Sequence, residues 1–382
     1  MKTLTLTLGF LVVGAPALAS QQNDEHLERA RRILAQTPLI DGHNDLPWAI
    51  RRFQAAPRSV AGYDITGRAP GHTDLERLGS GMLGAQFWSV YIPADYADSG
   101  FARMQLEQID IARQFIAKYS GYFEMARDAS DIERIFASGK IASMLGIEGG
   151  HAIENSLGVL RTYYDLGARY MTLTHGGTLD WADSATDEER HGGLTRFGEE
   201  VVREMNRMGM LVDLSHVSPG SMSDALNVAG APVIFSHSSA RALVDHPRNV
   251  PDSILRRLPD NGGVVMVTFV RSFVSNDEAT ASLSDVADHI EHVRRVAGAD
   301  HVGIGGDFDG IEAGPHGLED VSTYPALFAE LSRRAWSDED LMKLAGENLL
   351  RVMREAERTA RRLQRERPPS TKTIEELDGS VM

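Results

Sequence analysis

Short apolar runs alternate with longer amphipathic stretches along almost the whole chain. The apolar runs are rich in Val, Ile and Leu, which is typical of strands that are buried on both faces. Counting the run that ends at Asp45, there are eight of them: residues 38–45, 84–91, 141–147, 170–173, 210–214, 232–235, 263–267 and 301–304. Helical spacing lies between them, over residues 102–118, 130–137, 156–166, 197–208, 219–228, 251–258 and 283–297. A strand followed by a helix, repeated along a chain, predicts a (β/α)8 TIM-type barrel.

A length of 382 residues is ordinary for one such barrel with insertions. We expect a single α/β domain over residues 20–365, with an N-terminal helix over residues 21–36 and a C-terminal helical extension over residues 337–364. Residues 366–382 are predicted to form a flexible tail. The alternative is an open doubly wound sheet, but the Gly-rich phosphate loop expected after its first strand is absent, which favours the barrel.

The first 19 residues have the pattern of a signal peptide. Lys2 gives the positive start, residues 3–13 form an apolar run too short to span a bilayer, and Ala17-Leu18-Ala19 is a small-x-small cleavage site. We therefore expect an exported protein, periplasmic or secreted. The charged C-terminus lacks the apolar tail of a glycolipid-anchor signal, so no membrane anchor is expected.

Composition excludes several classes of function. The formal net charge is −15, which does not suit nucleic acid or anionic lipid, because both need clustered Lys and Arg. The chain has no Cys, so thiolate nucleophiles, Cys-based zinc fingers and disulfides are excluded. A transition metal would have to be held by His, Asp and Glu.

Metal-capable side chains follow the predicted strands at the point where each strand ends. They are His43, Asp45, Glu148, His175, His216, His237 and Asp307. Active sites of these barrels lie at the C-terminal ends of the strands. Residues far apart in the sequence are therefore expected to converge on one mouth.

Each of these residues also has an ordinary structural interpretation. The tripeptide His43-Asn44-Asp45 offers an imidazole and a carboxylate on one side of a strand, but it could also be a turn in which the His is satisfied by neighbouring groups. Glu148 ends an apolar run, where a carboxylate is costly unless it is paired or metal-bound. It could bridge two cations or form a buried salt bridge. A single His after a strand is more often a capping or core residue than a ligand. His216 and His237 both follow an apolar run and a Ser, however, and this repeated context favours a shared cation.

A second acidic pair lies in Gly305-Gly-Asp-Phe-Asp-Gly310. A Gly/Asp turn is one interpretation, in which the side chains stabilise the loop. The other is a carboxylate held beside the metals to accept and donate a proton. We expect Asp307 to have the catalytic role and Asp309 the structural one.

At these residues the chain resembles the membrane dipeptidase family, also called renal dipeptidases, which are zinc metallopeptidases of the amidohydrolase type. The matching stretches are Asp41–Trp48, Gly146–His151, Thr172–His175 with Trp181–Asp183, Val212–Ser218, Phe235–Ala240, Arg248–Asp252 and Gly305–Gly310, and they span about residues 28–360. The resemblance implies two Zn²⁺ per chain. It assigns His43 and Asp45 to one zinc ion, His216 and His237 to the other, and Glu148 to both.

The same resemblance implies the remaining roles and the reaction. His175 would contact the scissile carbonyl oxygen, Arg248 would bind the C-terminal carboxylate of the substrate, and Asp307 would transfer the proton. The expected reaction is hydrolysis of dipeptides that have a free C-terminal carboxylate, by a metal-bridging hydroxide. A homodimer is also implied. Two stretches, residues 176–179 and 270–273, differ from the mammalian members and lie by predicted strand ends, so the resemblance carries over the chemistry and not the substrate preference.

Two other functions remain open from the sequence. The same binuclear site could hydrolyse another small amide or a β-lactam. A periplasmic protein that binds metal or peptide without turnover would need the ligands but not Asp307, because a carrier does not transfer a proton.

Overall fold

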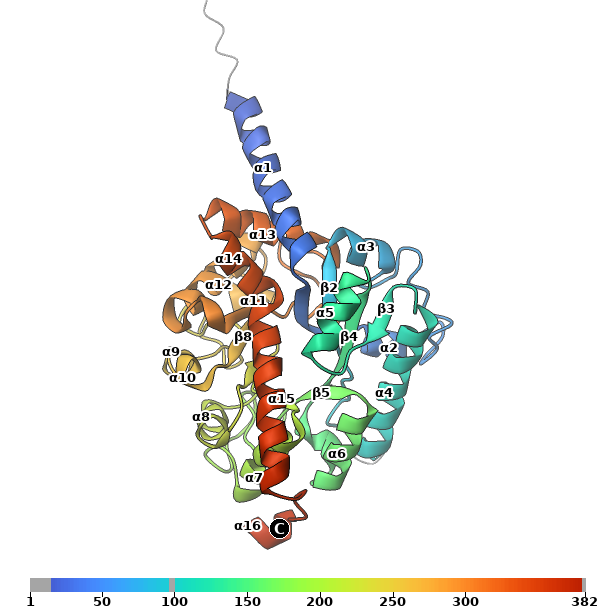
Figure 1. Cartoon of the computed structure of the whole chain (residues 1–382), viewed down its shortest axis with the longest axis vertical. Helices are drawn as coiled ribbons and strands as arrows, with labels where there is room; N and C mark the ends of the chain where they lie inside the picture. The colour runs from blue at the N-terminus through green and yellow to red at the C-terminus, as the bar shows by residue number, and fades with distance from the viewer. Residues whose placement is uncertain (1–14, 96–99, 380–382) are drawn as a thin grey trace, which may run out of the picture.

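The computed structural model describes residues 15–95 and 100–379. Eight parallel strands close into a barrel (Figure 1): β1 (Leu39–Asn44), β2 (Leu83–Ser89), β4 (Ile141–Glu148), β5 (Ala168–Thr172), β6 (Leu211–Asp213), β7 (Ile234–Phe235), β8 (Val264–Val267) and β9 (Val302–Ile304). β1 pairs with both β2 and β9, and the pairing of β2 with β4 closes the ring. The predicted (β/α)8 fold is confirmed, and each of the eight predicted runs overlaps one barrel strand.

A ninth strand, β3 (Phe123–Met125), lies outside the ring and pairs with the first residues of β4. Sequence analysis missed it, since three residues are too few to show a strand period.

Helices cover the outside of the barrel (Figure 1). They are α1 (Ala15–Gln36), α2 (Leu46–Arg52), α3 (Leu75–Ser80), α4 (Phe101–Lys118), α5 (Ala129–Ala137), α6 (Leu157–Leu166), α7 (Arg196–Met208), α8 (Pro219–Val228), α9 (Asp252–Leu255), α10 (Leu258–Asn261), α11 (Arg271–Val274), α12 (Leu283–Ala297), α13 (Tyr324–Arg333), α14 (Asp338–Met342), α15 (Asn348–Glu366) and α16 (Ile374–Asp378). The helix predicted over residues 251–258 ends early, at Leu255, and a second short helix begins at Leu258. Pro259 lies in the first turn of this second helix, because it has no backbone N–H with which to continue the first.

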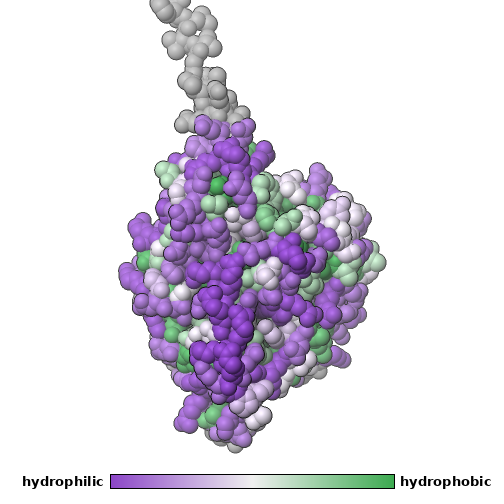
Figure 2. Space-filling model, in the orientation of Figure 1, coloured by the Kyte–Doolittle hydropathy of each residue, from purple (hydrophilic) through white to green (hydrophobic). Residues whose placement is uncertain are grey.

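The long helix α15 shows how the helical layer packs. Its buried side chains, such as Leu349, Met353, Ala356 and Ala360, recur every three or four residues and face the body of the protein. The opposite face is rich in Arg and Glu. Figure 2 shows this as a hydrophilic strip along the front of the molecule, where Figure 1 places α15.

The two ends of the chain differ in how far they follow the sequence prediction. The proposed signal peptide lies largely outside the described residues, and α1 begins at Ala15 and projects beyond the barrel (Figure 1). Within residues 15–95 and 100–379, no helix is long and apolar enough to span a membrane. At the other end, Ile374 is buried and the Asp378 carboxylate accepts hydrogen bonds from the first backbone N–H groups of α7. This packing differs from the loose tail that the sequence predicts.

Two glycines let three strands meet at the mouth of the barrel. A Cβ on Gly42 or on Gly305 would collide with the backbone carbonyl oxygen of Ser236. The ends of β1 and β9 therefore approach the end of β7 more closely than a side chain would allow. These residues flank His43, His237 and Asp307, so the approach sets the size of the site.

Replacing Gly305 by Ala should lower the free energy of unfolding by about 1–3 kcal/mol, because the new methyl group meets the backbone carbonyl oxygen of Ser236, which cannot move aside. Thermal unfolding measures the effect. Gly79→Ala is the matched control: Gly79 lies in α3, its new methyl group would have no described atom within 4 Å, and Ala favours a helix. Equal unfolding midpoints for the two variants would contradict the close approach.

Candidate metal centre

The structure places all eight sequence-predicted site residues at the C-terminal ends of the barrel strands. His43 lies near the end of β1, Glu148 is the last residue of β4, and the others follow β1, β5, β6, β7 and β9 in loops: Asp45, His175, His216, His237, Arg248 and Asp307. Asp45 lies just after β1, at the N-cap position of α2, so a turn and not strand alternation brings it to His43. All eight contribute to one site.

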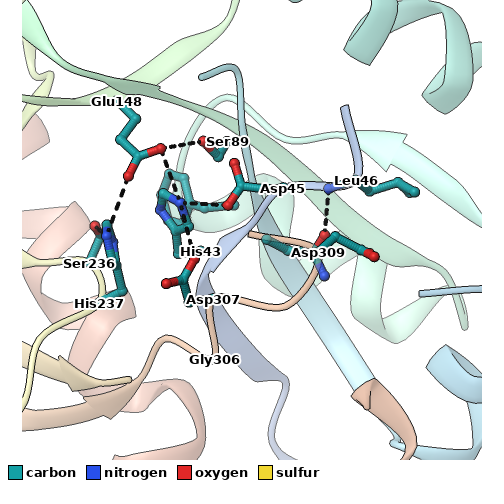
Figure 3. A network of polar contacts seen from close by, with 12 residues as sticks. His43, Asp45, Leu46, Ser89, Glu148, Ser236, His237, Gly306, Asp307 and Asp309 are labelled. Atoms are coloured by element: carbon teal, nitrogen blue, oxygen red, sulfur yellow. Dashed lines mark hydrogen bonds and ion pairs between the residues drawn. The ribbon is translucent and has the colours of Figure 1, made fainter. Parts of the chain in front are cut away.

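Glu148 lies at the centre of this site, and its two carboxylate oxygens face different partners (Figure 3). Oε1 lies 3.0 Å from His216 Nε2 and 3.4 Å from His237 Nε2. Oε2 lies 3.5 Å from His43 Nε2 and 3.2 Å from the hydroxyl of Ser89, which donates to it. One buried carboxylate thus lies between two groups of side chains, one around His43 and one formed by His216 and His237.

His43 belongs to the first group. Its Nε2 lies 3.2 Å from Asp45 Oδ2 and 3.9 Å from Asp307 Oδ1, and Figure 3 shows all these groups facing one another. Burial acts to lower the pKa of His43, but Tyr170 and the carboxylates of Glu148 and Asp45 outweigh it and raise the pKa well above its usual value. The position strongly stabilises positive charge.

The second group consists of His216 and His237, whose Nε2 atoms lie 2.9 Å apart. Burial holds the pKa of both rings well below the usual value, so both are neutral near pH 7. His175 stands beside them, with its Nε2 3.7 Å from Glu148 Oε1 and its ring between those of Tyr91 and His216.

Two of the carboxylates at the mouth, Glu148 and Asp307, differ in how these surroundings shift their pKa values. Burial raises the pKa of Glu148, but His43, His216 and His237 reverse this effect and hold it well below the usual range. For Asp307, burial raises the pKa well above the usual value, and the nearby carboxylates add to it. Glu148 is therefore a fixed anion, whereas Asp307 takes up a proton easily.

The donor set fits divalent metal ions of the zinc type. The ligand atoms of His43, Glu148 and His237 lie within 4.8 Å of one another, and so do two overlapping sets: Glu148 with His175 and His216, and His43 with Asp45 and Asp307. His43 Nε2 and Asp45 Oδ1 are buried and have no hydrogen-bond partner among the described residues. Buried polar atoms without partners are costly, and a cation would satisfy both. Neutral imidazoles and carboxylates are the oxygen and nitrogen ligands that zinc takes in the absence of Cys.

A cavity of about 320 Å³ opens over these residues. Its walls combine the carboxylates and imidazoles with aromatic and aliphatic side chains, namely Trp48, Tyr91, Val270, Phe273 and Ile311. Arg248 is 5% exposed and packs its guanidinium over the ring of Phe273, and its buried Nη1 has no hydrogen-bond partner in the described part of the chain. Burial lowers its pKa to about 10, so it remains charged at neutral pH.

Comparison with known proteins is consistent with this geometry. The model of the membrane dipeptidase family, peptidase family M19, matches residues 27–367. The dipeptidase verJ of Clonostachys rogersoniana is 44% identical over 351 residues, which cover 89% of each chain. The chain belongs to the membrane dipeptidase family. It is a metal-dependent dipeptidase by this membership.

Two solved structures are similar over most of their length. A metallopeptidase from Rhodobacter sphaeroides, liganded with a phosphinate mimic of the dipeptide L-Ala-D-Ala, is 26% identical with a TM-score of 0.75, covering 84% of this chain and 99% of its own. The dipeptidase AC, also of family M19, is 27% identical with a TM-score of 0.76, covering 84% and 98%.

In this dipeptidase a buried relay orients His237. Its Nδ1 lies 2.8 Å from the Ser236 hydroxyl, which in turn donates to Asp213 Oδ2 at 2.6 Å. With Nε2 facing Glu148, Nδ1 carries the proton and donates to Ser236. Asp213 also accepts from the hydroxyl of Thr172 and from two backbone N–H groups, so its charge is well satisfied.

A second buried carboxylate, Asp41, ties β1 to the loop that contains Asp307. It accepts hydrogen bonds from the backbone N–H groups of His43 and Gly306, from Gln86, and from the hydroxyl of Tyr324. Sequence analysis assigned no role to Asp41 or Asp213. The available signal was a carboxylate inside an apolar run, which must be satisfied by partners elsewhere in the chain.

Backbone conformation also shows where the site is held under strain. His216 and Asp307 adopt left-handed φ values of 68° and 63°, which cost non-glycine residues free energy on the order of 1–3 kcal/mol. Asp309 is left-handed too, and its carboxylate accepts from the backbone N–H of His72 at 2.7 Å. These bends direct His216 and Asp307 into the mouth, while Asp309 secures the loop.

Replacing Ser236 by Ala should weaken metal binding by about tenfold to a hundredfold, because the His237 ring loses the group that fixes its tautomer and orientation. Competition with a chromogenic chelator measures the dissociation constant. Ser239→Ala is the control, since its buried hydroxyl has no hydrogen-bond partner among the described residues. If both variants bind metal as tightly as the wild type, the relay has no influence on the metal centre.

Proposed function

We propose that this enzyme hydrolyses dipeptides with a free C-terminal carboxylate, using two zinc ions. The proposal rests on one observation: the two carboxylate oxygens of Glu148 face different groups of ligand side chains. His43 and Asp45 would hold one zinc ion, His216 and His237 the other, and Glu148 both. When bound, the ions would supply a Lewis acid and a water molecule of lowered pKa.

The remaining side chains then act directly on the substrate. His175 lines the cavity with a 28% exposed side chain, and its ring is held between those of Tyr91 and His216. We assign it a hydrogen bond to the scissile carbonyl oxygen, where negative charge develops. Asp307 lines the same cavity and would accept a proton from water and return it to the leaving amine.

Arg248 would anchor the terminal carboxylate. It is a buried cation whose Nη1 lacks a partner among the described residues, and it lines the cavity that contains the ligand groups. A guanidinium binds a carboxylate in a bidentate manner, and a free carboxylate next to the scissile bond is what distinguishes a dipeptide from an internal peptide bond. The Rhodobacter sphaeroides relative, solved with a mimic of L-Ala-D-Ala, supports a ligand of this size.

The direct test is hydrolysis of a panel of dipeptides before and after chelation. Activity should disappear with chelator and return with zinc. Glu148→Gln keeps the side-chain volume but removes the charge, so it should lose metal and at least about a hundredfold of activity together. Measured turnover and metal content report both effects. A Glu148→Gln variant that keeps full activity would contradict the role of the shared carboxylate.

Replacing Arg248 by Ala should lower kcat/KM for dipeptides with a free carboxylate by about tenfold to a hundredfold, the range for a hydrogen-bonded charge. C-terminally amidated dipeptides serve as control substrates, since they offer no carboxylate to the guanidinium. An equal loss on both kinds of substrate would show that Arg248 does not anchor the carboxylate.

We also propose export after cleavage behind Ala19, on the sequence pattern of residues 1–19. The mature enzyme would begin at Ser20 with one catalytic domain, which N-terminal sequencing of the exported protein would test. We also propose a homodimer, on the family resemblance alone, and light scattering would test it by measuring the molar mass in solution.

A further inference from the structure

Two arginines line the catalytic cavity at different depths. Arg248 is buried and lies over Phe273, whereas Arg52 is exposed and is the last residue of α2. A dipeptide has one terminal carboxylate, which the proposed function assigns to Arg248. The guanidinium of Arg52 is therefore available for another group of the substrate.

No acceptor among the described residues makes a hydrogen bond or ion pair with Arg52. Its neighbour Arg51 turns away from the cavity and binds Glu107 at 2.9 Å. Three carboxylates line the same cavity, Asp45, Glu148 and Asp307, and none lies within ion-pair distance of Arg52. Arg52 is thus a cation at the mouth of the site whose guanidinium has no ion pair within the described part of the chain. It favours an anionic group of the ligand over a structural ion pair.

The strand order shows which part of a dipeptide would face Arg52. Arg248 follows β7, whereas Trp48 and Arg52 follow β1 and form another part of the cavity wall; β8 and β9 separate these two strands in the ring, so the two arginines enter the cavity from different sides. A substrate with its carboxylate at Arg248 and its scissile bond over Glu148 extends its first residue toward this wall.

There is room for a side chain on that side. A second cavity of about 770 Å³ adjoins the first, and Arg52 and Ile311 line both. Phe53 and Tyr63 form part of its wall. Two carboxylates, Asp309 and Glu312, also line it, and neither forms an ion pair with Arg52. A side chain that leaves the first residue can thus reach Arg52 without displacing the terminal carboxylate.

We infer that Arg52 is a specificity residue, which favours dipeptides with an acidic side chain, Asp or Glu, on the first residue. The inference rests on the proposed function and adds a substrate class to it. An ion pair at an exposed position is modest in strength, so the expected preference is about threefold to fivefold and appears mainly in KM.

The experiment compares L-Glu-L-Ala with its neutral analogue L-Gln-L-Ala in the zinc-loaded enzyme. The wild type should prefer the acidic substrate, and Arg52→Gln should remove the preference, with kcat/KM on L-Ala-L-Ala measured for each variant as the reference. Arg52→Glu should instead favour L-Lys-L-Ala over L-Gln-L-Ala. Arg51→Gln is the matched control, because it removes an adjacent guanidinium that is paired with Glu107 and lines neither cavity.

Three results would overturn the inference: no acidic preference in the wild type, an equal change on all substrates in Arg52→Gln, or a preference that follows an acidic second residue in L-Ala-L-Glu against L-Ala-L-Gln. In each case turnover of L-Ala-L-Ala shows that the proposed dipeptidase function still holds. Absence of turnover on every dipeptide would instead refute the proposed function, and the inference with it.

Discussion

The organisation of the site follows from the need to bury one charged carboxylate. Glu148 is buried at the end of β4, where an isolated charge would be very costly. Its cost is offset by imidazoles that come from other strands: His43 from β1, and His216 and His237 from the loops after β6 and β7. These strands meet because the sheet closes on itself, so closure of the barrel and assembly of the site are one event. Metal ions between the two ligand groups would complete the compensation that the neutral imidazoles of His216 and His237 leave unfinished.

The protein holds this arrangement with a second layer of charge and with strained backbone. Asp41 and Asp213 are themselves buried carboxylates, and each is satisfied by several donors from different strands or loops. They orient the ligands, whereas left-handed φ values at His216 and Asp307 aim the side chains inward. Stability and site geometry therefore depend on the same hydrogen bonds, as is common where a fold must hold like charges close together.

The sequence predicted the barrel strands, and it predicted which side chains meet at one mouth, because both have local signals; that these side chains bind metal stays a prediction. A short apolar run marks a barrel strand, and a His or Glu that ends such a run marks the mouth. The rest depended on partners far away in the chain. Tyr170 lies inside an apolar strand, and only the folded barrel shows that its hydroxyl lies 2.9 Å from His43 Nδ1. The contact of Asp378 with α7 likewise could not be predicted from the local sequence. The same holds for Arg52, which forms no ion pair with any described residue. For Asp45 the pairing with His43 was anticipated, but through strand alternation and not through the turn that is observed.

The central claim is that Glu148 is shared by two metal ions, one on each side of its carboxylate. Anomalous diffraction at the zinc absorption edge, from crystals of the zinc-loaded enzyme, tests it directly. The account predicts two strong anomalous peaks that both lie within coordination distance of Glu148, one against His43 and Asp45 and one against His216 and His237. A single peak, or peaks that leave Glu148 outside the coordination of either ion, would contradict it.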